Sequence, residues 1–195
     1  MYLSWLAKNY IEVLGSLAGL VYLYFSIRQI IWLWPLGIIT SLLYIFVFLN
    51  SKFYAAMGLQ VYYFFISIYG WYYWKKTDNP DAGENTRVVS LSFSQWIILP
   101  AITGLLTLLL GFILDEYTDS PLPFWDAFTT AGSIVATWML ARRYLENWLF
   151  WIGVDLIAIG IYTYKNLYPT VILFVVYTSM AFIGYIRWKN ELKKD

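Results

Sequence analysis

Seven apolar stretches, each close to the length that crosses a bilayer, constrain this chain more than any other feature. A membrane-spanning helix needs about 20 apolar residues, and polar or charged residues separate the seven stretches. The 195 residues are 61% hydrophobic and only 13% charged, whereas soluble domains are about 25% charged. The sequence therefore predicts an all-α integral membrane protein with seven transmembrane helices. They are expected at residues 11–27, 31–49, 55–74, 96–114, 124–140, 148–164 and 167–188.

The residue types that are missing exclude several classes of function. The chain has no cysteine and no histidine, which removes thiolate and imidazole catalysis and most transition-metal sites. A carboxylate pair would remain possible, but Asp155 has no second acid in its span. The net charge of +1 argues against a nucleic-acid partner, which would need a basic surface. We therefore expect that the protein is not an enzyme and has no metal site and no cofactor. Separately, its first residues do not resemble a removable signal peptide.

The chain repeats itself after 114 residues. Segments 34–75 and 148–189 share 11 identities in 42 positions without a gap. A single connector helix between the copies returns the chain to its starting side, so both copies cross the membrane in the same direction, as in parallel repeats. We expect a 3+1+3 plan with repeat one at 11–76, a connector helix at 95–114 and repeat two at 124–189. The matches include Trp34 with Trp148, Tyr63 with Tyr177, Gly70 with Gly184, and Trp74 with Trp188.

The basic residues are distributed unequally between the two sides of the predicted topology. Three lie on the side of the N-terminus and ten on the other side. Because short cytoplasmic loops carry the excess of lysine and arginine, the N-terminus is expected outside and the C-terminus in the cytoplasm.

One carboxylate and two indoles share a face of the sixth span. Trp148, Trp151 and Asp155 follow one another at spacings of three and four, which places them on one side of a helix. An ionisable group deep in a hydrocarbon span usually has a partner or borders a water-filled cavity. The alternative is that the tryptophans anchor the helix at the membrane interface and that Asp155 is a polar packing residue.

The third span carries a second polar and aromatic face. Gln60, Ser67 and Trp71 share that face, and Tyr63 occupies the position equivalent to Tyr177. Such groups can instead satisfy neighbouring helices. If they line a cavity, aromatic faces with one carboxylate suit a flat cationic organic solute, because a cation is attracted to the face of an aromatic ring.

Four segments carry the most specific sequence pattern. They are 122–126 (Leu-Pro-Phe-Trp-Asp), 133–136 (Ser-Ile-Val-Ala), 142–148 (Arg-Arg-Tyr-Leu-Glu-Asn-Trp) with Trp151, and 68–74 (Ile-Tyr-Gly-Trp-Tyr-Tyr-Trp) after Gln60 and Val61. With these segments the chain resembles the PnuC-type vitamin transporters along essentially its whole length. The resemblance implies facilitated diffusion of a vitamin across the bacterial inner membrane without ATP, and a separate cytoplasmic kinase that traps the vitamin by phosphorylation. It also implies a homotrimer, and by position it assigns Asn147, Trp148, Trp151 and Gln60 to the binding site.

One position departs from that family pattern and guides the choice of vitamin. Carriers of nicotinamide riboside typically have Asn four residues after the second tryptophan of the motif, where this chain has Asp155. That change resembles the thiamine-carrying branch, often called PnuT, so thiamine is the expected substrate and nicotinamide riboside the alternative. The predicted substrate-binding residues are Gln60, Tyr63, Ser67, Trp71, Asn147, Trp148, Trp151, Asp155 and Tyr177.

Overall fold

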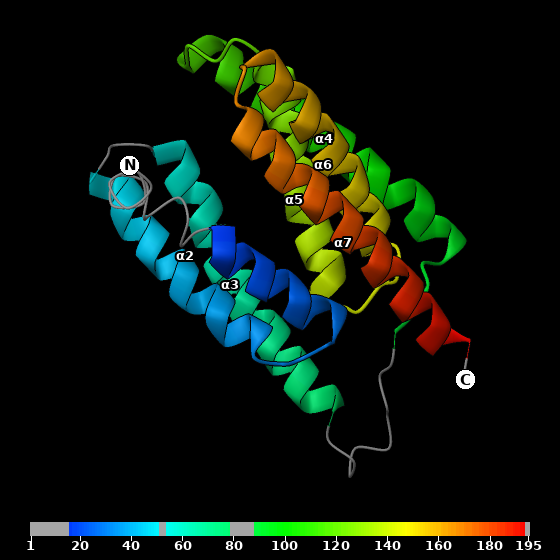
Figure 1. The fold of residues 1–195 in the computed structure, drawn as a ribbon. Helices are drawn as coiled ribbons and strands as arrows, with labels where there is room; N and C mark the ends of the chain where they lie inside the picture. Colours follow the sequence, from blue (N-terminus) through cyan, green and yellow to red (C-terminus); the bar gives the residue numbers. More distant parts are fainter. Residues whose placement is uncertain (1–15, 51–53, 79–87, 194–195) are drawn as a thin grey trace.

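The computed structural model describes residues 16–50, 54–78 and 88–193, and these ranges contain seven helices (Figure 1). The helix expected at 11–27 is described over Ser16–Ile27, and its first five residues lie outside the described residues. The observed helices end within a few residues of the predicted spans. After Ser16–Ile27 they are α2 (Leu33–Asn50), α3 (Tyr54–Thr77), α4 (Phe93–Tyr117), α5 (Pro123–Ala141), α6 (Asn147–Tyr164) and α7 (Tyr168–Leu192).

Only part of this helical set satisfies a strict length and hydropathy criterion for crossing a membrane. Among the described helices, α2, α4 and α7 satisfy it, with mean hydropathies of 1.8, 2.5 and 1.8, and Ser16–Ile27 is apolar but shorter. The sequence prediction of seven spans counted aromatic residues as membrane-compatible. Tryptophan and tyrosine have low hydropathy values although they are enriched at membrane interfaces, which explains the difference for an aromatic-rich helix such as α3.

Three of the connections use a left-handed residue to end a helix. Gln29, Arg143 and Asn166 have φ angles of 53°, 56° and 59°, and the backbone N–H of the next residue bonds five residues back. This is the Schellman arrangement, which satisfies carbonyls at a helix C-terminus. Gln29 and Arg143 lie 114 residues apart, and the surrounding turns make the same backbone hydrogen bonds.

The same spacing relates two buried tryptophan pairs. Trp34 and Trp74 meet edge to face with ring centroids 5.4 Å apart, and Trp148 and Trp188 do so at 5.5 Å. All four indoles are fully buried. Each pair needs a glycine, because a Cβ at Gly70 or Gly184 would lie 2.6 Å from the facing indole. We call residues 16–78 the first half and residues 123–193 the second half.

Each half sends an indole N–H to the other half. Trp74 Nε1 donates to the Ala141 carbonyl at 3.1 Å, and Trp188 Nε1 donates to the Ile27 carbonyl at 3.3 Å. The accepting carbonyls are again 114 residues apart. These bonds lie where Ser16–Ile27, α3, α5 and α7 all have their C-termini, and we call this the latched end of the bundle. Figure 1 accordingly shows Ser16–Ile27, in dark blue, beside α7.

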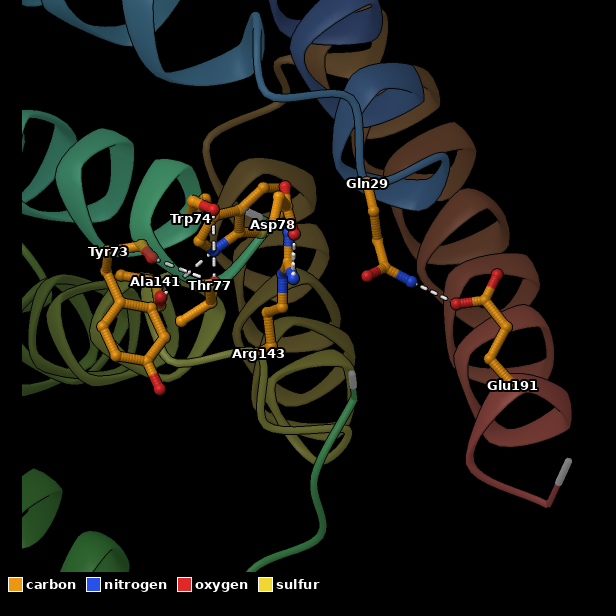
Figure 2. Close-up of polar contacts among 8 residues, drawn as sticks. All are labelled: Gln29, Tyr73, Trp74, Thr77, Asp78, Ala141, Arg143 and Glu191. Carbon is orange, nitrogen blue, oxygen red and sulfur yellow. Dashed lines mark hydrogen bonds and ion pairs between the residues drawn. The ribbon is translucent and has the colours of Figure 1, made fainter. Parts of the chain in front are cut away.

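Two further contacts join the halves at the latched end (Figure 2). Arg143 pairs with Asp78, with Nη1 and Oδ1 2.7 Å apart, and its guanidinium lies 4.3 Å from the ring centroid of Trp74. Gln29 donates a side-chain hydrogen bond to Glu191. At the latched end, therefore, both left-handed turn residues, Gln29 and Arg143, make a polar contact with the other half.

The connector α4 attaches to the second half. It packs along α5, and a Cβ at Gly111 would lie 2.4 Å from the Phe124 ring. Its first turn bonds the α5–α6 connection, where Gln95 Nε2 donates to the Tyr144 hydroxyl at 2.7 Å and the buried Glu146 accepts from the Leu91 N–H at 3.0 Å. Most of its apolar side chains are exposed, as expected for a helix that faces lipid.

Candidate functional site

A cavity of about 390 Å³ lies between the halves, a size typical of small-molecule sites. Its walls come from Ser16–Ile27, α5, α6 and α7, with Leu59 of α3 as a further contributor. The first helix can approach α7 so closely because residue 19 is glycine, where a Cβ would lie 2.2 Å from the Tyr177 hydroxyl oxygen. The cavity thus forms where the first helix of one half meets the helices of the other.

Asp155 lines this cavity from α6 and is 5% exposed. Among the described residues it forms no hydrogen bond and no ion pair. A buried carboxylate without a partner is costly, so a cation or a hydrogen-bond donor inside the cavity would stabilise it. This position fits the prediction that Asp155 faces a solute.

The two tryptophans of α6 occupy different environments although they share a helical face. Trp151 lines the main cavity and also a second one. Trp148 borders the main cavity but is fully buried, with its ring edge against Trp188. Because Trp34 packs in the same way in the first half, helix packing alone accounts for Trp148. Trp151 is therefore the better placed of the two for stacking on a solute.

An aromatic wall from α6 and α7 also lines the main cavity. Tyr162 stacks on Phe174 with ring centroids 5.2 Å apart, and Phe174 meets Tyr177 edge to face at 5.7 Å. All three line the cavity. Tyr177 was predicted as a site residue and lies in the cavity wall. Phe174 was not predicted, because a phenylalanine in an apolar helix carries no sequence signal of its own.

A second cavity of about 240 Å³ is lined mainly by the first half, with Thr137 and Trp151 from the second, and shares Gly19, Tyr22 and Trp151 with the main one. The predicted site residues of the third span are here: Gln60, Tyr63 and Ser67 line it from α3, together with hydroxyl groups of α2. The two groups of predicted residues therefore face adjoining cavities with one shared wall.

Two predicted site residues line neither cavity. Trp71, in α3, is 42% exposed and belongs to neither lining set. Asn147 is fully buried in the first turn of α6, where its Nδ2 donates to the Tyr144 carbonyl at 2.6 Å. The structure thus gives Asn147 a role in the α5–α6 turn.

Tyr22 lines both cavities but was absent from the sequence-based site. It belongs to the first helix, which the sequence presented as an apolar scaffold span. Only the packing of that helix against the other half brings Tyr22 to the cavities. No local sequence pattern would have identified it.

The α5 wall presents a row of hydroxyl groups whose protons are already engaged. Thr129 and Thr130 donate to the Asp126 carbonyl at 2.9 Å, Ser133 to the Thr129 carbonyl at 2.7 Å, and Thr137 to the Ser133 carbonyl at 2.7 Å. Their oxygens keep lone pairs that can accept hydrogen bonds. Neither lining set, taken over the described residues, contains lysine or arginine. This wall therefore favours solutes that bring donors or positive charge.

Metal ligation is not supported in the part of the chain that the structure describes, where no group of three or more acidic residues could hold an ion. The chemistry available is aromatic stacking, hydrogen-bond acceptance and one unpaired carboxylate. That combination can bind a flat cation reversibly.

Comparisons with known proteins identify similar transporters and a similar fold. The chain is 27% identical over 209 residues to the nicotinamide riboside transporter PnuC of Escherichia coli (strain K12), covering 95% of the chain and 87% of that protein. It is 27% identical over 196 residues to the riboflavin/roseoflavin transporter RibM of Streptomyces davaonensis, covering 94% and 86%. The crystal structure of the vitamin B3 transporter PnuC has the same fold, with a TM-score of 0.74, 24% identity, and 96% and 84% of the two chains covered.

The match to a family model covers nearly the whole chain. Residues 9–190 match the family described as nicotinamide mononucleotide transporter. This match, together with the apolar exposed helices, identifies a multi-pass membrane protein that works in transport and is not an enzyme. The chain belongs to the nicotinamide mononucleotide transporter family, whose PnuC-type members it was predicted to resemble.

Proposed function

We propose that this protein carries a vitamin across the bacterial inner membrane by facilitated diffusion. One observation carries the proposal: a cavity between two similar halves contains a carboxylate without a partner among the described residues, Asp155, and an aromatic wall. Sites at the interface of two repeats are usual in transporters. In alternating access, one half would move against the other around the bound vitamin.

Nicotinamide riboside is the substrate that the relatives support best. The PnuC relative from Escherichia coli is named as its transporter, and the RibM relative is named for riboflavin, which indicates a family of flat vitamins. The ring of nicotinamide riboside is cationic, and its amide and ribose hydroxyls supply donors. These groups would suit Asp155 and the hydroxyl oxygens of α5.

Thiamine remains a second candidate because of Asp155. An aspartate differs from an asparagine by accepting hydrogen bonds only and by its charge. The aminopyrimidine of thiamine offers donors that a carboxylate can accept, and its thiazolium ring is a cation. Both vitamins therefore satisfy the charge of the cavity, and binding must be compared directly.

Purified protein in liposomes tests the choice of vitamin and the mode of transport together. Labelled nicotinamide riboside, thiamine and riboflavin are offered separately, without ATP and without ion gradients. We expect one cationic vitamin to equilibrate to the outside concentration and to compete with the other. Accumulation above that concentration driven by a proton or sodium gradient would contradict facilitated diffusion, and transport of none of the three would contradict the function.

The proposed architecture is the parallel 3+1+3 plan, with repeats at 11–76 and 124–189 and the connector at 95–114. The paired indoles, the left-handed turns and the crossed indole hydrogen bonds at a spacing of 114 residues support it. The basic residues support an outside N-terminus and a cytoplasmic C-terminus. Reporter fusions at the two ends should then report opposite compartments, and signals from the same side would contradict the plan.

The proposed cellular setting includes a homotrimer and a separate cytoplasmic kinase. The exposed apolar face of α4 is available for lipid or for another copy of the chain. Phosphorylation inside the cell would remove the free vitamin and so maintain the inward gradient. Mass measurement of the detergent-purified protein tests the trimer, and deletion of the kinase should leave initial uptake intact but abolish retention.

A further inference from the structure

We propose that Asp126 is the first contact site for a cationic solute at the mouth of the main cavity, where the solute exchanges with the ammonium group of Lys165. The solute then moves inward to Asp155. This inference rests on the proposed transport of a cationic vitamin. The solute would thus meet two carboxylates on its way through the cavity, and Lys165 would neutralise the first of them until the solute arrives.

The main cavity is lined by two carboxylates at different depths. Asp126 lines it from the first turn of α5, and its side chain is 32% exposed. Asp155 lines it deeper and is 5% exposed. At the far end, next to the latched end, Ser26, Leu140 and Trp148 are at most 2% exposed. Exposure thus rises from the latched end towards Asp126, which places the mouth at Asp126.

The two oxygens of Asp126 have different partners. Ser120 Oγ donates to Oδ2 at 2.6 Å, and Lys165 Nζ lies 3.7 Å from Oδ1. A charge-assisted hydrogen bond between nitrogen and a carboxylate is normally about 2.7–2.9 Å long. The ammonium group is therefore close enough to neutralise Oδ1 but is not tightly bonded to it.

Lys165 is suited to leave when another cation arrives. It lies in the short connection after α6, its side chain is 29% exposed, and the pair therefore retains contact with solvent. Lysine is a compact charge on a flexible stem, so it can move away without disturbing a helix. A solute cation that reaches Oδ1 would replace one positive charge with another and leave the Ser120 bond intact.

A continuous aromatic surface connects the mouth to the inner carboxylate. Tyr162, Phe174 and Tyr177 line the cavity and contact one another in series. The faces of such rings attract cations. A flat cation can therefore keep favourable contacts while it passes from Asp126 to Asp155.

A purely structural role would explain Asp126 but not its partner. A carboxylate in the first turn of a helix is stabilised by the helix dipole, and the Ser120 hydrogen bond orders the chain before α5. Neither effect requires a lysine from the α6–α7 connection. If Asp126 is purely structural, removing the charge of Lys165 should not speed the association of a cation. If Lys165 competes with the solute for Asp126, removing its charge should speed association.

The experiment measures association rate constants of nicotinamide riboside, with thiamine as a second cationic probe, by stopped-flow tryptophan fluorescence of the full-length protein in detergent. Asp126→Asn should lower the rate constant about tenfold at low ionic strength, within the range of electrostatic steering. Lys165→Gln should raise it about twofold, because the competing cation is gone. Both differences should shrink at high salt, as screening shortens the range of the interaction.

Asp119→Asn is the matched control, because it removes the same charge from an exposed residue in the connection just before α5, outside the cavity. It should match the parent protein. The inference is overturned if Lys165→Gln associates no faster than the parent or if Asp119→Asn and Asp126→Asn are equally slow. Parent protein that binds neither cation would contradict the proposed function itself, whereas a binding parent with unchanged variants would contradict only the role of Asp126 and Lys165.

Discussion

The two halves share their packing residues but differ in the residues that face the cavities. Trp34 and Trp148 pack identically, and Gly70 and Gly184 make room for them. Apart from Tyr63 and Tyr177, several positions that line the cavities carry different residues at the same spacing of 114 residues. Gly37 corresponds to Trp151, Ser41 to Asp155, Gln60 to Phe174, and Ser67 to Ala181.

This difference separates the residues that pack the helices from the residues available to contact a solute. Buried packing at the latched end must be satisfied in each half, so the same residues recur. A vitamin without two-fold symmetry would contact each half differently, so the residues at the cavity positions could diverge. The residue types at matched cavity positions cannot simply be exchanged between the halves. At position 37, which matches Trp151, even a Cβ would lie 2.7 Å from Ser67 Oγ, so an indole could not fit.

The largest effect is expected from the matched indoles. Trp34→Ala and Trp148→Ala each remove a fully buried tryptophan, a change that typically costs about 3–5 kcal/mol. Both should lower the unfolding temperature of detergent-purified protein by similar amounts, whereas the exposed Trp96→Ala should not. If Trp148→Ala kept the parent's stability and lost only vitamin binding, Trp148 would belong to the site and the matched packing would be irrelevant.

The next effect concerns the matched positions Asp155 and Ser41. Asp155→Asn should weaken binding of a cationic vitamin about 10–100-fold, because hydrogen bonds to charged groups contribute about 1.5–3 kcal/mol. Ser41→Ala removes a buried hydroxyl from the second cavity and should have little effect on affinity. Isothermal titration calorimetry with both vitamins measures this. An Asn variant that binds as tightly as the parent would make Asp155 a packing residue.

A smaller loss of affinity is expected for Trp151→Ala. Stacking of a flat ring on an aromatic side chain contributes about 1–3 kcal/mol, which is about 5- to 150-fold in affinity. The lower limit lies below that for Asp155, and the protein should stay folded. Trp71→Ala is the control, since Trp71 lines neither cavity. Equal losses for the two variants would bring Trp71 back into the site, as the sequence predicted.

The smallest effects are expected at the polar contacts of the latched end. Asp78→Asn and Glu191→Gln each weaken one contact between the halves. Partly exposed pairs of this kind contribute about 0–1 kcal/mol. Thermal unfolding should show a shift of a few degrees at most for either variant. A large loss in only one variant would mean that the halves are joined unequally.

The helices were predictable because bilayer thickness sets their length. The span expected at 148–164 is observed as Asn147–Tyr164, and the one expected at 124–140 as Pro123–Ala141. Proline also favours the first turn of a helix, which explains the start of α5. The pairing of Tyr63 and Tyr177 across the repeat placed both at cavity walls.

The site was less predictable because helical periodicity gives a face and not the neighbour that covers it. Trp148 and Trp151 share a face, yet one is buried against Trp188 and the other borders two cavities. Which residues cover that face depends on how the first helix packs against the other half. Tyr22 escaped prediction for the same reason.

If the proposed function holds, the row of hydroxyl acceptors on α5 also affects which form of the vitamin can leave the cell. A phosphate group adds about 1.5 to 2 negative charges at neutral pH and three strong acceptor oxygens. In the cavity it would meet the Asp155 carboxylate, hydroxyls such as Ser133 and Thr130 whose protons bond their own helix, and no lining lysine or arginine among the described residues. Like charges repel and acceptors cannot bond acceptors. We therefore expect the cavity to exclude the vitamin once it is phosphorylated, so that the phosphorylated form cannot leave by this path.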